Sequence, residues 1–285
     1  MIKILKYFVQ TLLIYILFII GRLLGINLSR KLFSFLFLKL GRFFKSTKII
    51  EKNLDQFSTN LPKVEKEKII TNMWKNYGMT FIEYIFLDFF HKDNPLIKID
   101  GKENLEEILI KKKPVIFVSG HFANFELMSM IITKHNIQLA TIYRPLNNFF
   151  LNPFMEYLRT KYICKNQIKK GINGVREAIN FIKKNHSIAL MIDQRVSEGE
   201  KINFFNKPAL TTTLPAQLSL KYNLNIVPVF IQRRNNTFVI EFYKNIKASD
   251  YADKINVTKK LNNVIEKMIT KNPSQWIWTH NRWKL

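Results

Sequence analysis

The sequence contains a single cysteine, Cys164, among 285 residues, so no internal disulfide can form. One thiol in a chain of this length is typical of a reducing compartment. Nucleotide-binding motifs are also missing, because neither a G-x-x-x-x-G-K-[S/T] loop nor a G-x-G-x-x-G pattern occurs. The five histidines are too scattered for a zinc site. We therefore expect neither a metal ion nor a cofactor.

Acidic residues are scarce, since 21 Asp and Glu stand against 45 Lys and Arg, a formal net charge of +24. Such an excess predicts anionic partners, although a lysine-rich, AT-biased composition accounts for part of it. Nucleic acid is not expected, because the sequence has no helix-turn-helix signal, zinc-ligand set or RNP-like aromatic motif. An acidic carrier protein, a phosphorylated lipid and an anionic membrane surface explain the charge better.

The N-terminus carries a long apolar segment, residues 7–21, with Lys3 and Lys6 before it and Arg22 after it. Fifteen helical residues span about 22 Å, and snorkelling lysines with Leu23 and Leu24 extend this toward the roughly 30 Å of a bilayer core. No small-residue cleavage site follows, so we expect an uncleaved membrane anchor, with a buried or interfacial helix as the alternative.

Basic residues are denser after the apolar segment than before it, which predicts that the body of the protein lies in the cytoplasm. Residues 32–44 are too apolar for an ordinary exposed helix and either pack on the core or lie along the membrane. We divide the chain into an anchor and amphipathic segment, residues 1–48, and a globular domain, residues 49–285.

From about residue 97 the sequence alternates between strand and helix patterns. This predicts an α/β fold with a mixed central sheet flanked by helices. The expected strands are 97–99, 115–118, 139–143, 188–192, and a hairpin of 226–232 with 238–243. The expected helices include 125–134, 152–161, 174–184, 214–222 and 257–269.

The segment PVIFVSGHFANFELM, residues 114–128, is the most informative part of the chain. His121 directly follows an expected core strand, and Glu126 lies in the helix after it, an arrangement that suits a base and the carboxylate that orients it. Five helical steps would rotate the two side chains about 140° apart, so His121 must lie in the loop and Glu126 in the first helical turn. Gly120 and Asn124 favour such a turn. The alternative is a surface histidine in a loop.

Polar side chains also follow other expected strands: Arg144 after 139–143 and Asp193 after 188–192. Chemistry in such sheets gathers where strands end. Arg144 and Arg159 suit phosphate or carboxylate groups, because guanidinium binds oxyanions in a bidentate manner, although solvated surface arginines remain the alternative. Asp193 is expected to bond a substrate hydroxyl or hold an arginine, with a capping or ion-pair role equally open.

Six ordered segments resemble the bacterial lipid A late acyltransferases, the lauroyl/myristoyl transferase family. GHFANFEL resembles the family pattern H-x-G-N-W/F-E-L, and the tail PSQWIWTHNRWK resembles P-x-Q-W-x-W-x-H-x-R-W-K. The others are IYRPLNN, FMEYLRTKY, LMIDQR and INFFNKPALTTT. Two residues depart from the pattern, Ala123 and Asn206, each standing where the family has glycine.

The resemblance implies a glycerolipid-acyltransferase-like fold and transfer of a fatty acyl chain from acyl-acyl carrier protein to a Kdo-bearing, phosphorylated lipid A precursor. It implies His121 and Glu126 as catalytic residues at a bacterial inner membrane, with the catalytic domain facing the cytoplasm. Asn124, Arg144, Arg159 and Asp193 are the expected substrate-binding residues. Two alternatives stay open: the same chemistry on another membrane glycolipid or aminolipid, and a non-catalytic, basic membrane-binding protein.

Overall fold

The computed structural model describes residues 2–44 and 46–285. In this part of the chain an eight-stranded sheet runs in the order β1-β9-β8-β2-β5-β3-β4, and β10 pairs with β8. The strands are β1 (Ile97–Asp100), β2 (Ile116–Ser119), β3 (Leu139–Tyr143), β4 (Asn166–Lys169), β5 (Ser187–Met191), β8 (Asn225–Arg234), β9 (Thr237–Phe242) and β10 (Ile246–Lys247). Strands β8, β2, β5, β3 and β4 are parallel, whereas β9 is antiparallel to β8. A separate hairpin consists of β6 (Glu200–Phe204) and β7 (Lys207–Thr211).

Strand β2 lies in the middle of this sheet and is buried along its whole length. Ile116 and Val118 contribute to the hydrophobic core on one face, and Phe117 contributes to the core on the other. A parallel strand covered on both faces needs a continuous apolar run, and the sequence supplies one.

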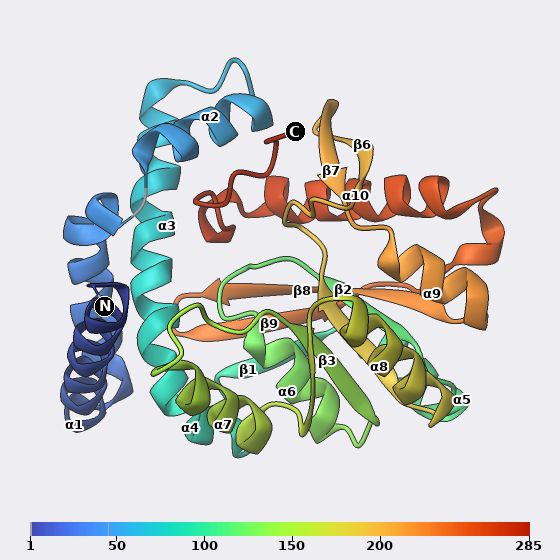
Figure 1. Ribbon diagram of the computed structural model, residues 1–285, viewed down its shortest axis with the longest axis horizontal. Helices are drawn as coiled ribbons and strands as arrows, with labels where there is room; N and C mark the ends of the chain where they lie inside the picture. The colour runs from blue at the N-terminus through green and yellow to red at the C-terminus, as the bar shows by residue number, and fades with distance from the viewer. Residues whose placement is uncertain (1, 45) are drawn as a thin grey trace.

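Helices cover both faces of the sheet, as Figure 1 shows, with α9 and α10 above it and α4, α6 and α7 below it. One core includes residues of α2 (Thr47–Phe57), α8 (Ile172–Lys183), α9 (Leu214–Tyr222) and α10 (Lys254–Lys271). The other core includes residues of α4 (Leu87–His91), α5 (Lys102–Lys111), α6 (Glu126–Lys134) and α7 (Asn152–Tyr162). Helix α3 (Lys63–Glu83) contributes to both, and short 3₁₀ turns lie at Tyr84–Phe86, Ala248–Asp250 and Pro273–Gln275.

Helix α1 (Ile2–Phe44) consists of two arms joined at Gly25, whose backbone has φ 71° and ψ 164°. The hydroxyl of Ser29 donates to the carbonyl of Gly21 at 2.6 Å, a contact eight residues apart that a straight helix cannot form. Both arms pack beside α3 (Figure 1), and the rings of Phe18 and Phe33 contact the ring of Phe81.

The first arm of α1 has one face on the body of the protein and one apolar face exposed. The hydroxyl of Thr11 donates to Asn148 at 3.1 Å, and Arg22 forms an ion pair with Asp88 at 2.6 Å. The exposed face carries Leu5, Phe8, Leu12, Ile16, Ile19 and Leu23. Residues Ile2–Phe43 are long and apolar enough to cross a membrane, which indicates membrane anchoring.

The second arm of α1, after Gly25, likewise has one buried face and one exposed apolar face. Phe33 is fully buried, whereas Phe35 and Phe43 are exposed, so this arm both packs on the core and presents apolar side chains outward. The division of the chain at residue 48 falls inside α2 and stays a prediction.

The predicted fold class is confirmed. The expected strands appear as β1, β2, β3, β5 and the β8–β9 hairpin. Strands β4 and β10 and the β6–β7 hairpin were not predicted, because short polar segments such as Asn166–Lys169 become strands only by pairing with neighbours.

Candidate active site

His121 lies in the loop between β2 and α6 and pairs with Asp193, which follows β5. Nδ1 of His121 lies 2.8 Å from Oδ1 of Asp193, and the backbone N–H of His121 donates to Oδ2 at 2.9 Å. Strands β2 and β5 are parallel neighbours, so their carboxyl ends bring the two residues together. A Cβ on Gly120 would lie 3.2 Å from the Asp193 side chain, and glycine there allows this close approach.

The environment of Asp193 determines which nitrogen of His121 acts as a base. Burial favours the neutral acid, but the charge and hydrogen bonds of His121 and a hydrogen bond from Trp276 outweigh it, and the pKa of Asp193 is lowered. The ionised carboxylate only accepts hydrogen bonds, so Nδ1 of His121 carries a proton in the neutral ring as well as in the charged one. No residue that the structure describes hydrogen-bonds to Nε2, which is left to accept a proton.

Glu126 begins α6, as predicted. Its carboxylate contacts Arg159 and Tyr84 instead of the expected His121. Its Oε1 accepts hydrogen bonds from Nε and Nη2 of Arg159, at 2.8 and 2.6 Å, and from the hydroxyl of Tyr84 at 2.7 Å. The reason is electrostatic, since a buried carboxylate is stabilised far more by a guanidinium than by a neutral imidazole. The orienting contact that sequence reasoning assigned to Glu126 is made by Asp193.

Arg159 is 8% exposed and projects from α7. Burial opposes its charge, but the carboxylate of Glu126 outweighs this, and the pKa of Arg159 is raised. Within the described chain, its Nη1 group is buried without a hydrogen-bond partner. Arg159 is therefore a charge-compensated guanidinium that retains one unused donor.

A cavity of about 230 Å³ joins these groups. His121, Glu126, Arg144 and Arg159 all line it. Apolar side chains form another part of its wall: Phe125, Met128, Ile142, Ile163, Leu190, Met191 and Leu214. The cavity therefore presents a base and cations beside an apolar surface.

Asn124 lies apart from the cavity. It is 1% exposed, and its amide donates to Oε2 of Glu83 at 3.1 Å. Glu83 is fully buried and also pairs with Arg30 of α1, at 2.7 Å, and with Arg233 of β8. This placement favours a structural role, in which Asn124 ties the His121 loop to a buried cluster that includes α1.

Sequence reasoning assigned no site role to three residues that contact this machinery. Trp276 donates its indole N–H to Oδ2 of Asp193 at 2.8 Å, and Tyr84 bonds Glu126. His280 lines the cavity, and its Nε2 accepts from the backbone N–H of Arg195 at 3.0 Å. Burial lowers the pKa of His280 to about 4, so the ring is neutral near pH 7. The Trp-rich tail was the available signal, but the site residues that it contacts, Asp193 and Arg195, lie 83 and 85 residues before their partners in the sequence.

The two departures from the glycine pattern lie at left-handed backbone positions. Ala123 has φ 43° and Asn206 has φ 58°. Asparagine tolerates this region, whereas alanine is strained there by about 1–2 kcal/mol. Ala123 is held by a hydrogen bond from its N–H to the carbonyl of Gln275 and by one from Thr80 to its own carbonyl.

Among the residues that the structure describes, no group of three or more His, Cys, Asp or Glu side chains is placed to hold a metal ion.

Comparison with known proteins assigns the chain to one family. A profile of the family described as bacterial lipid A biosynthesis acyltransferase matches residues 1–285. The lipid A biosynthesis palmitoleoyltransferase of Escherichia coli (strain K12) is 25% identical over 244 residues, which cover 83% of this chain and 78% of the relative. A lipid A biosynthesis acyltransferase of Haemophilus influenzae is 25% identical over 265 residues, 88% of this chain and 82% of the relative.

A crystal structure of the 1-acyl-sn-glycerophosphate acyltransferase from Thermotoga maritima aligns with 95% of this chain and 99% of that chain. The TM-score is 0.43 and the sequence identity is 14%.

Proposed function

The chain belongs to the bacterial lipid A biosynthesis acyltransferase family and is an acyltransferase of that pathway, and we propose its reaction and its catalytic base. It moves a fatty acyl chain from acyl-acyl carrier protein to a hydroxyl of a Kdo-bearing, phosphorylated lipid A precursor. His121 is the general base. The observation that carries this proposal is the His121–Asp193 pair at a cavity with both cationic and apolar walls.

The reaction begins when Nε2 of His121 removes the proton from the acceptor hydroxyl. The oxygen attacks the thioester carbonyl, and the tetrahedral intermediate expels the carrier thiolate as the new ester forms. The imidazolium then returns its proton to that thiolate, so the protein ends unchanged. Asp193 stabilises the imidazolium through the 2.8 Å contact to Nδ1. No protein nucleophile is required.

Arg159 supports the same step from the cavity wall. Its unpartnered Nη1 donor and its charge suit the oxyanion that develops on the thioester carbonyl, an interaction worth about 10²–10³ in kcat elsewhere. Glu126 contributes by holding the guanidinium with two hydrogen bonds. In this proposal Glu126 positions Arg159 rather than His121.

The proposed location is the bacterial inner membrane, with the catalytic domain facing the cytoplasm. Support comes from the exposed apolar face of α1 and from the basic residues that follow the apolar segment. An acyl acceptor dissolved in the bilayer would then lie beside the cavity-bearing domain.

The test is acyl transfer by purified His121→Ala enzyme, with acyl-acyl carrier protein and the lipid A precursor as substrates. We expect kcat/KM to fall about 10²–10⁴-fold while the thermal midpoint stays close to that of the wild type. His186→Ala is the matched control, because His186 lies at the opposite end of β5 from Asp193. Full turnover by His121→Ala would remove His121 from the mechanism.

The acceptor is tested separately by mass spectrometry of total lipids from a deletion strain. Loss of one acyl chain from lipid A supports the proposal. Loss of an acyl chain from another glycolipid or an aminolipid instead would transfer the same chemistry to that acceptor.

A further inference from the structure

Three cationic side chains gather at one side of the active-site cavity: Arg144, Lys170 and Arg195. They come from three separate segments, directly after β3, directly after β4 and four residues after β5. These strands are adjacent and parallel in the order β5-β3-β4, so the sheet itself delivers the three charges to one edge.

Backbone and tail contacts position two of these residues. The N–H of Lys170 donates to the carbonyl of Tyr143 at 2.8 Å, which places Lys170 beside Arg144. The N–H of Arg195 donates to His280, and its Nε donates to the carbonyl of Lys284 at 2.6 Å. These bonds hold the segments that carry Lys170 and Arg195 in place.

The three charges differ from that of Arg159, which Glu126 compensates. The ion pairs of the described chain include Lys169–Glu156 but none that involves Arg144, Lys170 or Arg195. Although Lys170 is exposed, partial desolvation and the charge of Arg144 lower its pKa, whereas the charge of Glu198 acts to raise it. Uncompensated like charges held together are destabilising unless an anion joins them.

We propose that Arg144, Lys170 and Arg195 form a binding site for a phosphate ester, the group that anchors a substrate while its reacting end lies at His121. This inference rests on the proposed function and refines it, because it assigns the substrate phosphate to residues other than Arg159. Phosphate esters occur on both expected substrates, as the glycolipid phosphate of the acceptor and as the phosphopantetheine arm of the carrier protein. The shared chemistry is an anionic phosphate ester whose oxygens accept several charge-assisted hydrogen bonds.

The experiment measures binding rather than turnover. Isothermal titration calorimetry on the full chain in detergent micelles compares diacylglucosamine 1-phosphate with its dephosphorylated form, and 4′-phosphopantetheine with pantetheine. No reaction occurs in the absence of a second substrate, so this measurement stands even if the proposed acyl transfer fails in its own assay. The variants are Arg144→Gln, Lys170→Gln and Arg195→Gln.

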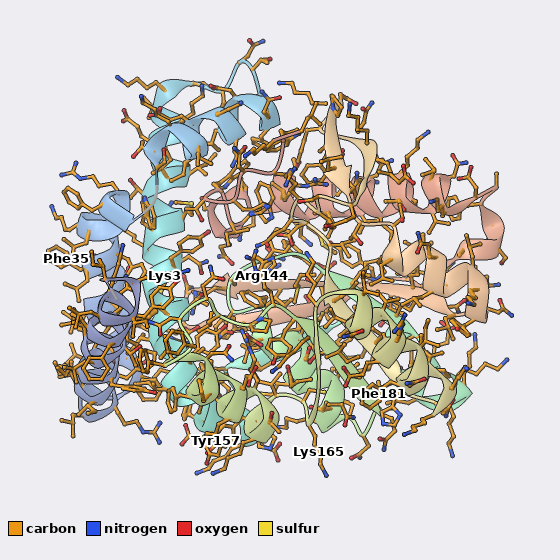
Figure 2. The ribbon with its side chains drawn as sticks, in the orientation of Figure 1. Lys3, Phe35, Arg144, Tyr157, Lys165 and Phe181 are labelled. Carbon is orange, nitrogen blue, oxygen red and sulfur yellow. The ribbon has the colours of Figure 1, made fainter. Side chains whose placement is uncertain are left out.

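The matched control is Lys165→Gln, which removes the same charge from an exposed residue. Figure 2 shows Lys165 at the lower edge of the molecule, whereas Arg144 lies near its centre. A thermal melt of each variant verifies that it is folded.

We expect one phosphorylated probe to bind the wild type at least tenfold more tightly than its dephosphorylated form. Each site substitution should lower that preference roughly tenfold, and Lys165→Gln should leave it unchanged. A preference for the glycolipid phosphate identifies the acceptor as the source, and one for phosphopantetheine identifies the donor. No preference in the wild type, or an equal loss in Lys165→Gln, would overturn the site.

Discussion

The indole N–H of Trp276 lies 2.8 Å from Oδ2 of Asp193, whose other oxygen contacts His121 at the same distance. The three side chains come from the loop after β2, the end of β5 and the C-terminal tail. Trp276 and Asp193 are each 1% exposed, so water does not compete for these bonds. The tail is thereby part of the arrangement that holds the catalytic base.

Trp276→Phe should therefore change how activity depends on pH. The substitution removes a donor that favours the ionised carboxylate, so the pKa of Asp193 rises and its protonation begins at a higher pH. We expect the acid limb of the kcat/KM profile to move to higher pH and the maximal rate to fall about tenfold. Trp278→Phe is the control, because Trp278 is equally buried but donates to the carbonyl of Pro273. A shift of equal size in both variants would argue for a general packing effect.

Asp193→Asn should alter both activity and the pH dependence of stability. Burial acts to raise the pKa of Asp193, but His121 and Trp276 lower it overall. The ionised carboxylate therefore stabilises the fold at pH values above about 3.9, the pKa of an aspartate in the unfolded chain. This stabilisation is lost as the pH falls through the lower pKa that Asp193 has in the folded protein. We expect a deficit of about 1–3 kcal/mol in the free energy of unfolding near pH 7. The deficit should shrink below about pH 4.

Denaturant titrations in detergent at several pH values measure this deficit, and the same samples should lose at least about 10² in kcat. A deficit that grows toward acid pH would contradict the assigned ionisation.

Glu126→Gln should destabilise the protein without shifting the pH profile. The substitution leaves the buried guanidinium of Arg159 without its compensating charge, which is expected to reduce the free energy of unfolding by about 3–5 kcal/mol. The double variant Glu126→Gln/Arg159→Met should recover much of that stability but not the rate. Thermal melts and steady-state kinetics on the wild type, Glu126→Gln, Arg159→Met and the double variant complete the cycle. If Glu126 acted directly on His121, its loss would move the acid limb as Trp276→Phe does.

Gly78→Ala should loosen the contact between α1 and α3. A Cβ at Gly78 would lie 2.0 Å from the carbonyl oxygen of Phe33, a backbone atom that cannot rotate away. We expect a loss of about 1–3 kcal/mol in the free energy of unfolding and faster proteolysis between α1 and α2. Glu67→Ala, on an exposed position of the same helix, should leave both unchanged. Unaltered protection of α1 in Gly78→Ala would show that the two helices separate without strain.

Much of the fold could be predicted because its central strands are continuous apolar runs. Strands β2, β5 and the β8–β9 hairpin are nearly all buried. Buried strands need runs of apolar residues, and such runs can be recognised in the sequence. Strand β4 carries the polar sequence Asn-Gln-Ile-Lys and exists because it pairs with β3. The β6–β7 hairpin matched the family pattern, but its strands have only five residues each, include charged residues and form by pairing with each other.

The candidate site divides in the same way. The sequence by itself determined that His121 follows a core strand in a loop and that Glu126 opens the next helix, because local apolar runs and turn residues set both positions. Only the tertiary structure decided their partners. Asp193 reaches His121 across 72 residues and Arg159 reaches Glu126 across 33, because strand order and helix packing decide which charges meet in a buried, low-dielectric site.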